Sequence, residues 1–374
     1  MDAEWMRLAL ELAEFGEGDV HPNPLVGAVV VKDGKAIGRG YHRRFGDPHA
    51  EIFALDEAGV ASRDATLYVT LEPCCHHGKT PPCTDRILAS GVRRVVVAVR
   101  DPNPEVDGGG IACLHDAGIE VTEGVLQEEA EQQNEIFFTC SRLRRPFVQL
   151  KLAVSADGRI ATKTGDSQWI SFEPSRVEAH RLRRKFMSVL VGVQTVLSDD
   201  PLLTVRHVVG PDPVSVVLDR RGRTPPTAQL LGAHPSPIVV TATMAADLEA
   251  RLRSRGARVW RLADDAGGID LPRLLADLFE EGIDSVLIEG GGETAAAFLN
   301  AGRVDKVSLF IAPILIGGRG GVPAVGGAGV ERVADALRLD RVTAEWFGPD
   351  LLYTGYPVKG GNSARSVTLS SLGV

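Results

Sequence analysis

Residues 72–83 read EPCCHHGKTPPC, a single loop with five potential transition-metal ligands: Cys74, Cys75, His76, His77 and Cys83. A catalytic zinc ion takes about three protein ligands and keeps one position open. The loop therefore holds more candidate ligands than one such ion uses, and some of them must have another role. The sequence on either side indicates which fold carries the loop.

The loop lies within an alternation of strands and helices. Asp33-Gly34 is typical of a hairpin turn between two apolar stretches, and Gly59 is typical of a helix end. Continuous valine runs indicate strands that are buried on both faces, so we expect an α/β layer sandwich. In chain order, the pattern predicts strands at 25–31, 36–42, 66–72 and 93–100 and helices at 49–59, 83–91, 110–118 and 126–142.

A second alternation begins after the basic stretch 142-RLRRP-146, where we place a domain boundary. We expect domains at 1–144 and 145–359. The stretch at 360–374 loses periodicity and is predicted to be a mobile tail. In the second domain the pattern predicts strands at 147–155, 188–193, 214–219, 238–242, 285–289 and 306–317 and helices at 173–186, 245–256, 271–282 and 294–302.

The composition limits the class of partner. The chain has 374 residues, 44% apolar and 24% charged, as expected for a globular protein with about two domains. Its net charge is −8 and no run of five or six basic residues occurs, which argues against a nucleic-acid partner and for a small substrate. The short basic clusters at 142–145 and 181–185 are, on composition alone, a solvated linker and a solvated helix face.

Cysteine usage and hydropathy indicate the compartment. Three of the five cysteines lie within ten residues, which favours metal or thiol chemistry over disulfides. The N-terminal stretch lacks the basic start and apolar core of a signal peptide, and no apolar run approaches the roughly 18 residues of a membrane span. We expect a cytoplasmic protein without a membrane partner.

A histidine and a glutamate begin the predicted helix upstream of the loop. His49 and Glu51, followed by a strand and Pro73-Cys74, are typical of zinc nucleobase deaminases. Zinc held by one imidazole and two thiolates makes water a nucleophile near neutral pH. Glu51 would carry protons from that water to the ring nitrogen and the departing ammonia. We therefore predict His49, Cys74 and Cys83 as zinc ligands and Glu51 as the catalytic residue.

The spacing of the two cysteine ligands departs from the simple deaminase pattern. Eight residues separate Cys74 from Cys83 where two are usual, so an insertion lies at the mouth of the predicted pocket. We expect both cysteines at the start of a helix, where the helix dipole favours the thiolate. A closed structural zinc site with two cysteines and two histidines is the alternative, and it would need no glutamate.

Other cysteines and histidines have structural explanations. Cys113 and Cys140 lie on apolar helix faces and are expected to be small core residues. His180, His207 and His234 have no partner nearby in sequence and are expected to be surface or hydrogen-bonded histidines.

Longer stretches carry a family resemblance. In the first half they are 22-PNPLVGAVVV-31, 48-PHAEIFAL-55, 70-TLEPCCHHGKTPPC-83 and 100-RDPNPEVDGGG-110. In the second half they are 149-QLKLAVSADGRIA-161, 165-GDSQWIS-171, 192-GVQTVLSDDPLLTVR-206 and 311-IAPILIGG-318. Over about 350 residues the chain thus resembles the bifunctional riboflavin-biosynthesis deaminase/reductase family.

The resemblance implies a fold and two reactions. A cytidine-deaminase-like three-layer α/β/α domain would be followed by a dihydrofolate-reductase-like α/β domain. The first would use zinc to deaminate a diaminohydroxyphosphoribosylaminopyrimidine, and the second would use NADPH to reduce the ribosyl side chain of the product to ribityl. The partner is then a small phosphorylated pyrimidine.

The resemblance also implies site residues. Cys75 stands where the family commonly has serine and would be a bystander, and His77 would face substrate rather than metal. Near the deaminase substrate it implies Asn23, His42, His76, Lys79, Asp101 and Asn103. Near the reductase substrate it implies Lys151, Ser167, Arg183, Leu203, Arg206 and Glu289, with Arg183 and Arg206 at the phosphate. At the cofactor it implies Ala153, Trp169, Thr195, Asp199, Gly291, Gly292, Glu293 and Thr294.

The glycine loop 289-EGGGETAAAF-298 lies between a predicted strand and helix, where free backbone amides favour a phosphate. Gly292-Glu293 replaces the Pro-Thr common in the family. An acidic side chain beside a pyrophosphate would repel it unless Glu293 turns away.

Two rival functions stay open. A nucleic-acid-editing deaminase with an accessory domain would need a basic, aromatic-lined groove, which the charge of −8 and four tyrosines argue against. A non-enzymatic zinc-stabilised module that senses a nucleotide would not need Glu51. For the enzyme we expect a homo-oligomer.

Overall fold

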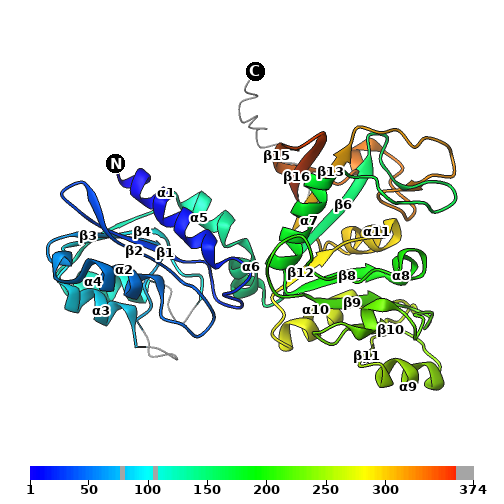
Figure 1. Cartoon of the computed structure of the whole chain (residues 1–374), viewed down its shortest axis with the longest axis horizontal. Coiled ribbons are helices and arrows are strands. Elements are labelled where there is room, and N and C mark those ends of the chain that lie inside the picture. Colours follow the sequence, from blue (N-terminus) through cyan, green and yellow to red (C-terminus); the bar gives the residue numbers. More distant parts are fainter. Residues whose placement is uncertain (76–80, 104–107, 359–374) are drawn as a thin grey trace. The chain divides into compact units, whose positions relative to one another are not determined.

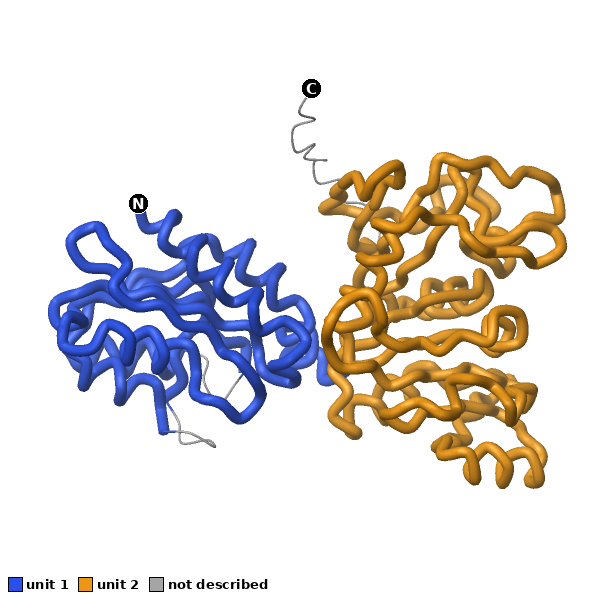
Figure 2. Tube along the Cα trace, in the orientation of Figure 1, with its two compact units in different colours: residues 1–145 blue, residues 146–374 orange. Residues whose placement is uncertain are grey.

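The chain folds as two compact units, Met1–Arg145 and Pro146–Val374 (Figure 2). The computed structural model describes residues 1–75, 81–103 and 108–358. The predicted tail at 360–374 therefore lies outside the described residues. Each unit is built on a sheet of its own.

Unit 1 contains a five-stranded mixed sheet in the order β2-β1-β3-β4-β5. The strand β1 is antiparallel to β2 and β3, whereas β3, β4 and β5 are mutually parallel. The strands are β1 (Gly27–Lys32), β2 (Lys35–Tyr41), β3 (Thr66–Leu71), β4 (Arg94–Val99) and β5 (Glu120–Glu123). The helices are α1 (Asp2–Ala13), α2 (Ala50–Ala58), α3 (Cys83–Ser90), α4 (Gly109–Asp116), α5 (Gln127–Gln133) and α6 (Glu135–Leu143).

Alternate strand residues of unit 1 pack against two helix layers. Val30, Leu67 and Val95 face one layer, which consists of α2, α3 and α4. Val29, Tyr68 and Val96 face the other, which consists of α1, α5 and α6 (Figure 1). Strands buried on both faces need apolar residues at successive positions, which explains the valine runs. The predicted three-layer α/β/α architecture is confirmed.

Short sequence motifs predicted the hairpin of unit 1 correctly but not the long helix at 126–142. Asp33 and Gly34 both have positive φ, 49° and 72°, as a tight hairpin turn requires, and they join β1 to β2. The predicted helix at 126–142 is wrong, because the chain breaks at Asn134 into α5 and α6. The buried Asn134 amide accepts from Leu25 N at 2.7 Å and donates to Leu25 O at 2.9 Å. This long-range pairing explains the break.

Unit 2 contains a nine-stranded sheet in the order β11-β10-β9-β8-β12-β6-β13-β16-β15, and a small β14-β7 sheet. The strands from β11 to β13 are parallel, and β16 is antiparallel to both of its neighbours. The strands are β6 (Phe147–Ser155), β7 (Arg159–Ala161), β8 (Ser188–Gly192), β9 (Val214–Leu218), β10 (Ile238–Thr241), β11 (Arg258–Arg261), β12 (Ser285–Ile288), β13 (Lys306–Ala312), β14 (Val322–Pro323), β15 (Leu339–Phe347) and β16 (Asp350–Pro357). The helices are α7 (Glu173–Lys185), α8 (Val193–Asp199), α9 (Ala246–Ser254), α10 (Leu271–Glu280) and α11 (Gly292–Asn300).

The core of unit 2 lies where α10 and α11 cover the middle of the sheet. Leu274 and Phe298 are fully buried there with Leu150 of β6. The expected α/β alternation is confirmed, but the predicted strand at 306–317 ends at Ala312, because Pro313 has no N–H for the ladder. Sequence periodicity missed β5, β7, β11, β14, β15, β16 and α8.

One distant carboxylate caps the helix that carries several predicted site residues. Asp350, at the start of β16, is fully buried and accepts from Phe172 N at 2.8 Å and Ser175 Oγ at 2.6 Å. These donors lie at the beginning of α7, so Asp350 satisfies part of its free N-terminal end. Across the described ranges, no helix has the length and apolar character to cross a bilayer.

Candidate functional site

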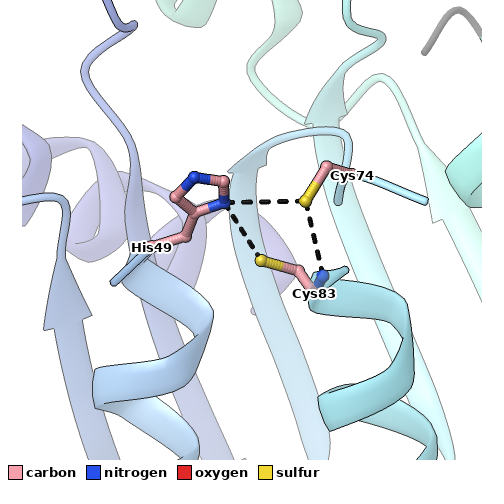
Figure 3. A group of neighbouring side chains, drawn as sticks. All are labelled: His49, Cys74 and Cys83. Carbon is pink, nitrogen blue, oxygen red and sulfur yellow. Dashed lines mark hydrogen bonds between the residues drawn. The ribbon is translucent and has the colours of Figure 1, made fainter. Parts of the chain in front are cut away.

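Three predicted zinc ligands from distant segments meet in unit 1 (Figure 3). His49 Nδ1 lies 3.2 Å from Cys83 Sγ and 3.6 Å from Cys74 Sγ. The three ligand atoms lie within 4.8 Å of one another. Among the side chains that the structure describes, they form the group of His, Cys and acidic residues close enough to share an ion.

The starts of two helices and the end of the central strand bring the three ligands together. His49 is the N-cap of α2, Cys83 is the first residue of α3, and Cys74 follows β3. The expectation that Cys74 itself begins a helix is wrong. Its sulfur nevertheless reaches the start of α3, where it accepts from Cys83 N at 3.3 Å.

The electrostatics at this point favour a thiolate. Hydrogen bonding from Cys83, and then from His49, lowers the pKa of Cys74 to about 4 against the opposing effect of burial. The same contact raises the pKa of Cys83. A metal ion that replaces the shared proton would be bound by both sulfurs.

Glu51 completes the group from the first turn of α2. Glu51 is only 3% exposed, and burial raises the pKa of its carboxyl. Its Oε2 is buried and has no hydrogen-bond partner in the described part of the chain. One imidazole and two thiols are a donor set that suits zinc, and an unsatisfied carboxylate beside it suits a bound water. The residues therefore fit a catalytic zinc ion.

Two further predicted residues lie against the donor group. The rings of His42 and His49 contact edge to face at a centroid distance of 5.5 Å. His42 Nδ1 lies 3.2 Å from Pro48 O, and its Nε2 lies 3.0 Å from Asn23 Nδ2. Burial lowers the pKa of His42, so the neutral ring donates from Nδ1 to the carbonyl and accepts from the Asn23 amide at Nε2.

A buried glutamate that sequence analysis missed organises the loop after β4. Glu72, 3% exposed, accepts from the backbone N–H groups of Asp101 at 3.3 Å, Gly108 at 3.0 Å and Ile111 at 3.1 Å. The predicted substrate residues Asp101 and Asn103 share this loop, and Asn103 N donates to Asp101 Oδ1 at 2.8 Å. The only sequence signal for Glu72 is its place directly before Pro73-Cys74.

The other candidate ligands of the loop at 72–83 are Cys75, which the structure describes, and two histidines, which it does not. Cys75 is not a member of the donor group, and its sulfur packs 2.9 Å from where a Cβ at Gly109 would stand. Its role as a bystander stays a prediction. The predicted substrate residues His76 and Lys79, and His77 beside them, lie outside the described residues.

Unit 2 contains a cavity of about 790 Å³. Both sets of predicted reductase residues contribute to its wall. All six residues predicted for the substrate line it: Lys151, Ser167, Arg183, Leu203, Arg206 and Glu289. Of the predicted cofactor residues, Ala153, Trp169, Thr195, Asp199 and Gly291 line it, whereas Gly292, Glu293 and Thr294 do not.

A buried ion cluster forms one wall of the cavity. Arg183 donates from Nε and Nη2 to the two carboxylate oxygens of Glu289 at 2.7 and 2.9 Å. Lys151 Nζ lies 3.7 Å from the same carboxylate. Although burial opposes it, the charges of Arg183 and Lys151 hold the pKa of Glu289 at about 2, whereas burial lowers the pKa of Lys151. The bidentate edge of Arg183, predicted for a substrate phosphate, is occupied by Glu289.

The cofactor residues gather where α8 and the glycine loop meet. The Oγ1 atoms of Thr195 and Thr294 lie 3.0 and 2.6 Å from where a Cβ would stand at Gly290 and Gly192, respectively. Gly291 has a φ of 81°, which only glycine adopts easily. Ser167 Oγ donates to Asp199 Oδ1 at 3.4 Å, and burial raises the pKa of Asp199.

The Glu293 side chain points toward the loop at 323–327. Its Oε1 accepts from Gly327 N at 3.2 Å, and Gly326 N donates to Gly292 O at 2.9 Å. The loop at 323–327 therefore lies along the start of α11. This arrangement engages the carboxylate that could otherwise repel a pyrophosphate.

Two different protein families match the two units of the chain. The cytidine and deoxycytidylate deaminase zinc-binding region matches residues 1–99, and the RibD C-terminal domain matches residues 146–353. The riboflavin biosynthesis protein RibD of Aquifex aeolicus is 45% identical over 353 residues, which are 94% of this chain and 97% of the relative. That of Escherichia coli is 40% identical over 94% of this chain and 98% of its own.

The chain belongs to the RibD family. The solved structure of Acinetobacter baumannii RibD agrees with a TM-score of 0.86 at 37% identity and covers 96% of this chain and 99% of its own. A Thermotoga maritima deaminase/reductase gives 0.84 at 39% identity with the same coverage. As a RibD protein the chain is a bifunctional deaminase/reductase of riboflavin biosynthesis. Its two domains indicate zinc and a nicotinamide cofactor.

Within this RibD reductase domain, sequence analysis missed two histidines of the cavity wall, His180 and His207. Their rings contact at a centroid distance of 4.6 Å, and His180 is 5% exposed. The signal that could have found His180 was spacing. His180 lies three residues before Arg183, which puts both on one face of α7.

Proposed function

We propose that unit 1 deaminates a diaminohydroxyphosphoribosylaminopyrimidine with zinc, and that unit 2 reduces the resulting 5-amino-6-(5-phosphoribosylamino)uracil with NADPH. The related Thermotoga maritima protein bears the names of both activities, the deaminase and the reductase. The observation that carries the proposal is the His49, Cys74 and Cys83 donor group, which lies beside a buried carboxylate oxygen of Glu51 that has no partner among the described residues.

In the deaminase step, His49, Cys74 and Cys83 would hold zinc, which when bound supplies a water of lowered pKa. Glu51 takes the two protons of the attacking water in turn and delivers the first to the ring nitrogen and the second to the departing ammonia, so that one C–N bond is replaced by a C–O bond. The proposed acceptor is its Oε2, to which no residue of the described ranges hydrogen-bonds.

Substrate orientation in unit 1 falls to residues around that group. Asn23 and His42 hold each other, and Asp101 and Asn103 share the loop held by Glu72. His76 and Lys79, outside the described residues, are proposed to face the substrate as well. Each of these contacts would fix the pyrimidine relative to Glu51.

In the reductase step, the nicotinamide supplies a hydride when bound. The cofactor set proposed from the sequence is Ala153, Trp169, Thr195, Asp199, Gly291, Gly292, Glu293 and Thr294. Lys151 and Glu289 would bring fixed charge to the ribosyl group, while Ser167 and Leu203 would contact the substrate. Arg206 and Arg183 both line the cavity, and the substrate phosphate is proposed to bind at these arginines.

The partner we propose is this small phosphorylated pyrimidine rather than a nucleic acid, supported by the net charge of −8. Exposed apolar side chains in unit 2, at Leu315, Val333 and Trp346, support association between copies of the chain. Light scattering of the full chain would measure the expected homo-oligomer.

The test is to give the diaminopyrimidine ribotide to the zinc-loaded protein, with and without NADPH, and to follow ammonia release and NADPH oxidation separately. Ammonia should appear without NADPH, and NADPH should be consumed only after deamination. NADH in place of NADPH measures cofactor preference. Absence of ammonia from zinc-loaded protein would overturn the proposal for unit 1.

A further inference from the structure

His180, a buried histidine of the unit 2 cavity, uses one ring nitrogen in a hydrogen bond, and no described residue bonds to the other. His180 on α7 is only 5% exposed, yet it forms part of the cavity wall. Its Nδ1 accepts from Arg206 N at 3.1 Å, and its ring lies against His207. No described residue hydrogen-bonds to its Nε2.

The bond from Arg206 N decides where the ring carries its proton. An imidazole nitrogen that accepts a hydrogen bond holds no proton, so neutral His180 has its proton on Nε2. Burial, and then the charges of Arg183 and Arg206, lower the pKa of His180 to about 4 and so keep the ring neutral at pH 7. Nε2–H is therefore an unused donor on a buried residue of the cavity wall.

The neighbouring arginines have unequal freedom to bind a ligand. Arg183 uses Nε and Nη2 on Glu289 and Nη1 on Thr204 O at 3.0 Å. Arg206 is exposed to the cavity, and the hydrogen bond of its side chain in the described structure goes from Nη1 to Thr204 Oγ1 at 3.1 Å. Arg206 thus keeps most of its donors for an anion, whereas Arg183 mainly positions Glu289 and the 204 segment.

We propose that His180 is a specificity-determining residue of the reductase, whose Nε2–H binds the phosphate monoester of the substrate together with the Arg206 guanidinium. This rests on the proposed reduction of a phosphorylated substrate. The Arg206 N–H aims the His180 ring, and the His207 ring supports it. A neutral donor beside a cation binds a phosphate and adds no further buried charge.

Two substitutions separate this role from a structural one, because each keeps one of the two ring nitrogens in effect. In His180→Asn, the amide oxygen can replace Nδ1 and hold Arg206 N–H, but nothing replaces Nε2–H. In His180→Gln, the amide nitrogen can replace Nε2–H. A role limited to holding Arg206 predicts that Asn is tolerated and Gln is not, whereas the phosphate role predicts the reverse.

The measurement is steady-state NADPH oxidation by the full chain, with the phosphorylated substrate and with its dephosphorylated nucleoside. Loss of a hydrogen bond to a charged group should raise the KM of His180→Asn for the phosphorylated substrate roughly tenfold to hundredfold, with the effect on KM rather than kcat. His180→Gln should stay within about threefold of wild type. The nucleoside should show no such difference between the variants.

Three results would overturn the proposal. His180→Asn could behave as wild type, it could lose the same factor with nucleoside and phosphorylated substrate, or its KM could rise for NADPH alone, which would assign the donor to a cofactor phosphate. Wild-type protein that oxidises no NADPH with either substrate would instead overturn the proposed reduction itself. Each variant keeps one polar group in place of a ring nitrogen. If one variant does not fold, the other still tests the proposal.

Discussion

The two candidate sites differ in how their polar groups are satisfied. In unit 1, Glu51 keeps a buried carboxylate oxygen to which no described residue hydrogen-bonds, beside three potential metal ligands. In unit 2, Arg183 and Lys151 both contact Glu289, so the charge of this carboxylate is compensated within the cavity wall. The first site is built to receive an ion and a water. The second is a preassembled wall that needs no ligand to be stable.

The difference predicts opposite responses to substitution. Replacing Glu51 removes the proposed proton carrier, whereas removing Glu289 leaves the cations of Arg183 and Lys151 without their carboxylate partner. A site with unsatisfied groups should lose activity at little cost in stability. A self-satisfied site should lose stability as well.

The largest effect is expected for Glu51→Gln. Deamination should fall by about a hundredfold to ten-thousandfold, because a neutral amide cannot carry the proton. Zinc content, measured by metal analysis, and NADPH-dependent reduction should be retained. Glu128→Gln, at an exposed position on α5, is the matched control. Full deamination by Glu51→Gln would show that Glu51 does not carry the proton, whereas wild-type protein that binds zinc and does not deaminate would support the sensing module.

A large loss of stability is expected for Glu289→Ala. Leaving Arg183 and Lys151 buried without their partner should lower the free energy of unfolding of unit 2 by about 3–5 kcal/mol, measured by denaturant titration. Deamination by unit 1 should persist under native conditions. An unchanged denaturation midpoint would mean that the cluster contributes nothing to folding.

The same cluster predicts a pH dependence. The pKa of Glu289 is about 2 in the folded protein against an ordinary value of 4.5. Its stabilisation is therefore present above about pH 4.5 and lost as the pH falls toward 2. The difference in unfolding free energy between wild type and Glu289→Gln should shrink over this window. A difference that stays constant there would contradict the assignment.

A smaller effect is expected for Glu72→Gln in unit 1. Its carboxylate accepts three backbone N–H groups, and an amide presents one acceptor oxygen only. One unpaired buried N–H costs about 1–3 kcal/mol, so hydrogen exchange at Asp101, Gly108 and Ile111 should speed up by roughly tenfold to hundredfold. Unchanged protection of all three amides would show that other contacts hold the loop.

The smallest effect is expected for Glu293→Gln. The carboxylate is exposed and bonded to Gly327 N, and an exposed charge interacts by less than about 1 kcal/mol. The KM for NADPH should therefore change by less than about fivefold. A much lower KM in the variant would show that Glu293 does repel the cofactor.

Sequence analysis was most successful where a function depends on nearby residues. His49 with Glu51, and Cys83, lie at helix starts that the sequence pattern predicted. The helix break at Asn134 escaped detection, because its hydrogen-bond partner, Leu25, is 109 residues away. Glu72 escaped for the same reason, since its three donors lie 29 to 39 residues further along the chain.

The sequence by itself determined which chemistry the first unit carries, because donor type and spacing limit what His49, Cys74, Cys83 and Glu51 can do. Only the tertiary structure decided how the charges of the second unit are shared. Arg183 and Glu289 are 106 residues apart, and which anion takes the guanidinium depends on packing that no local pattern encodes. The His180 Nε2–H, which no described residue accepts, depends on the same packing.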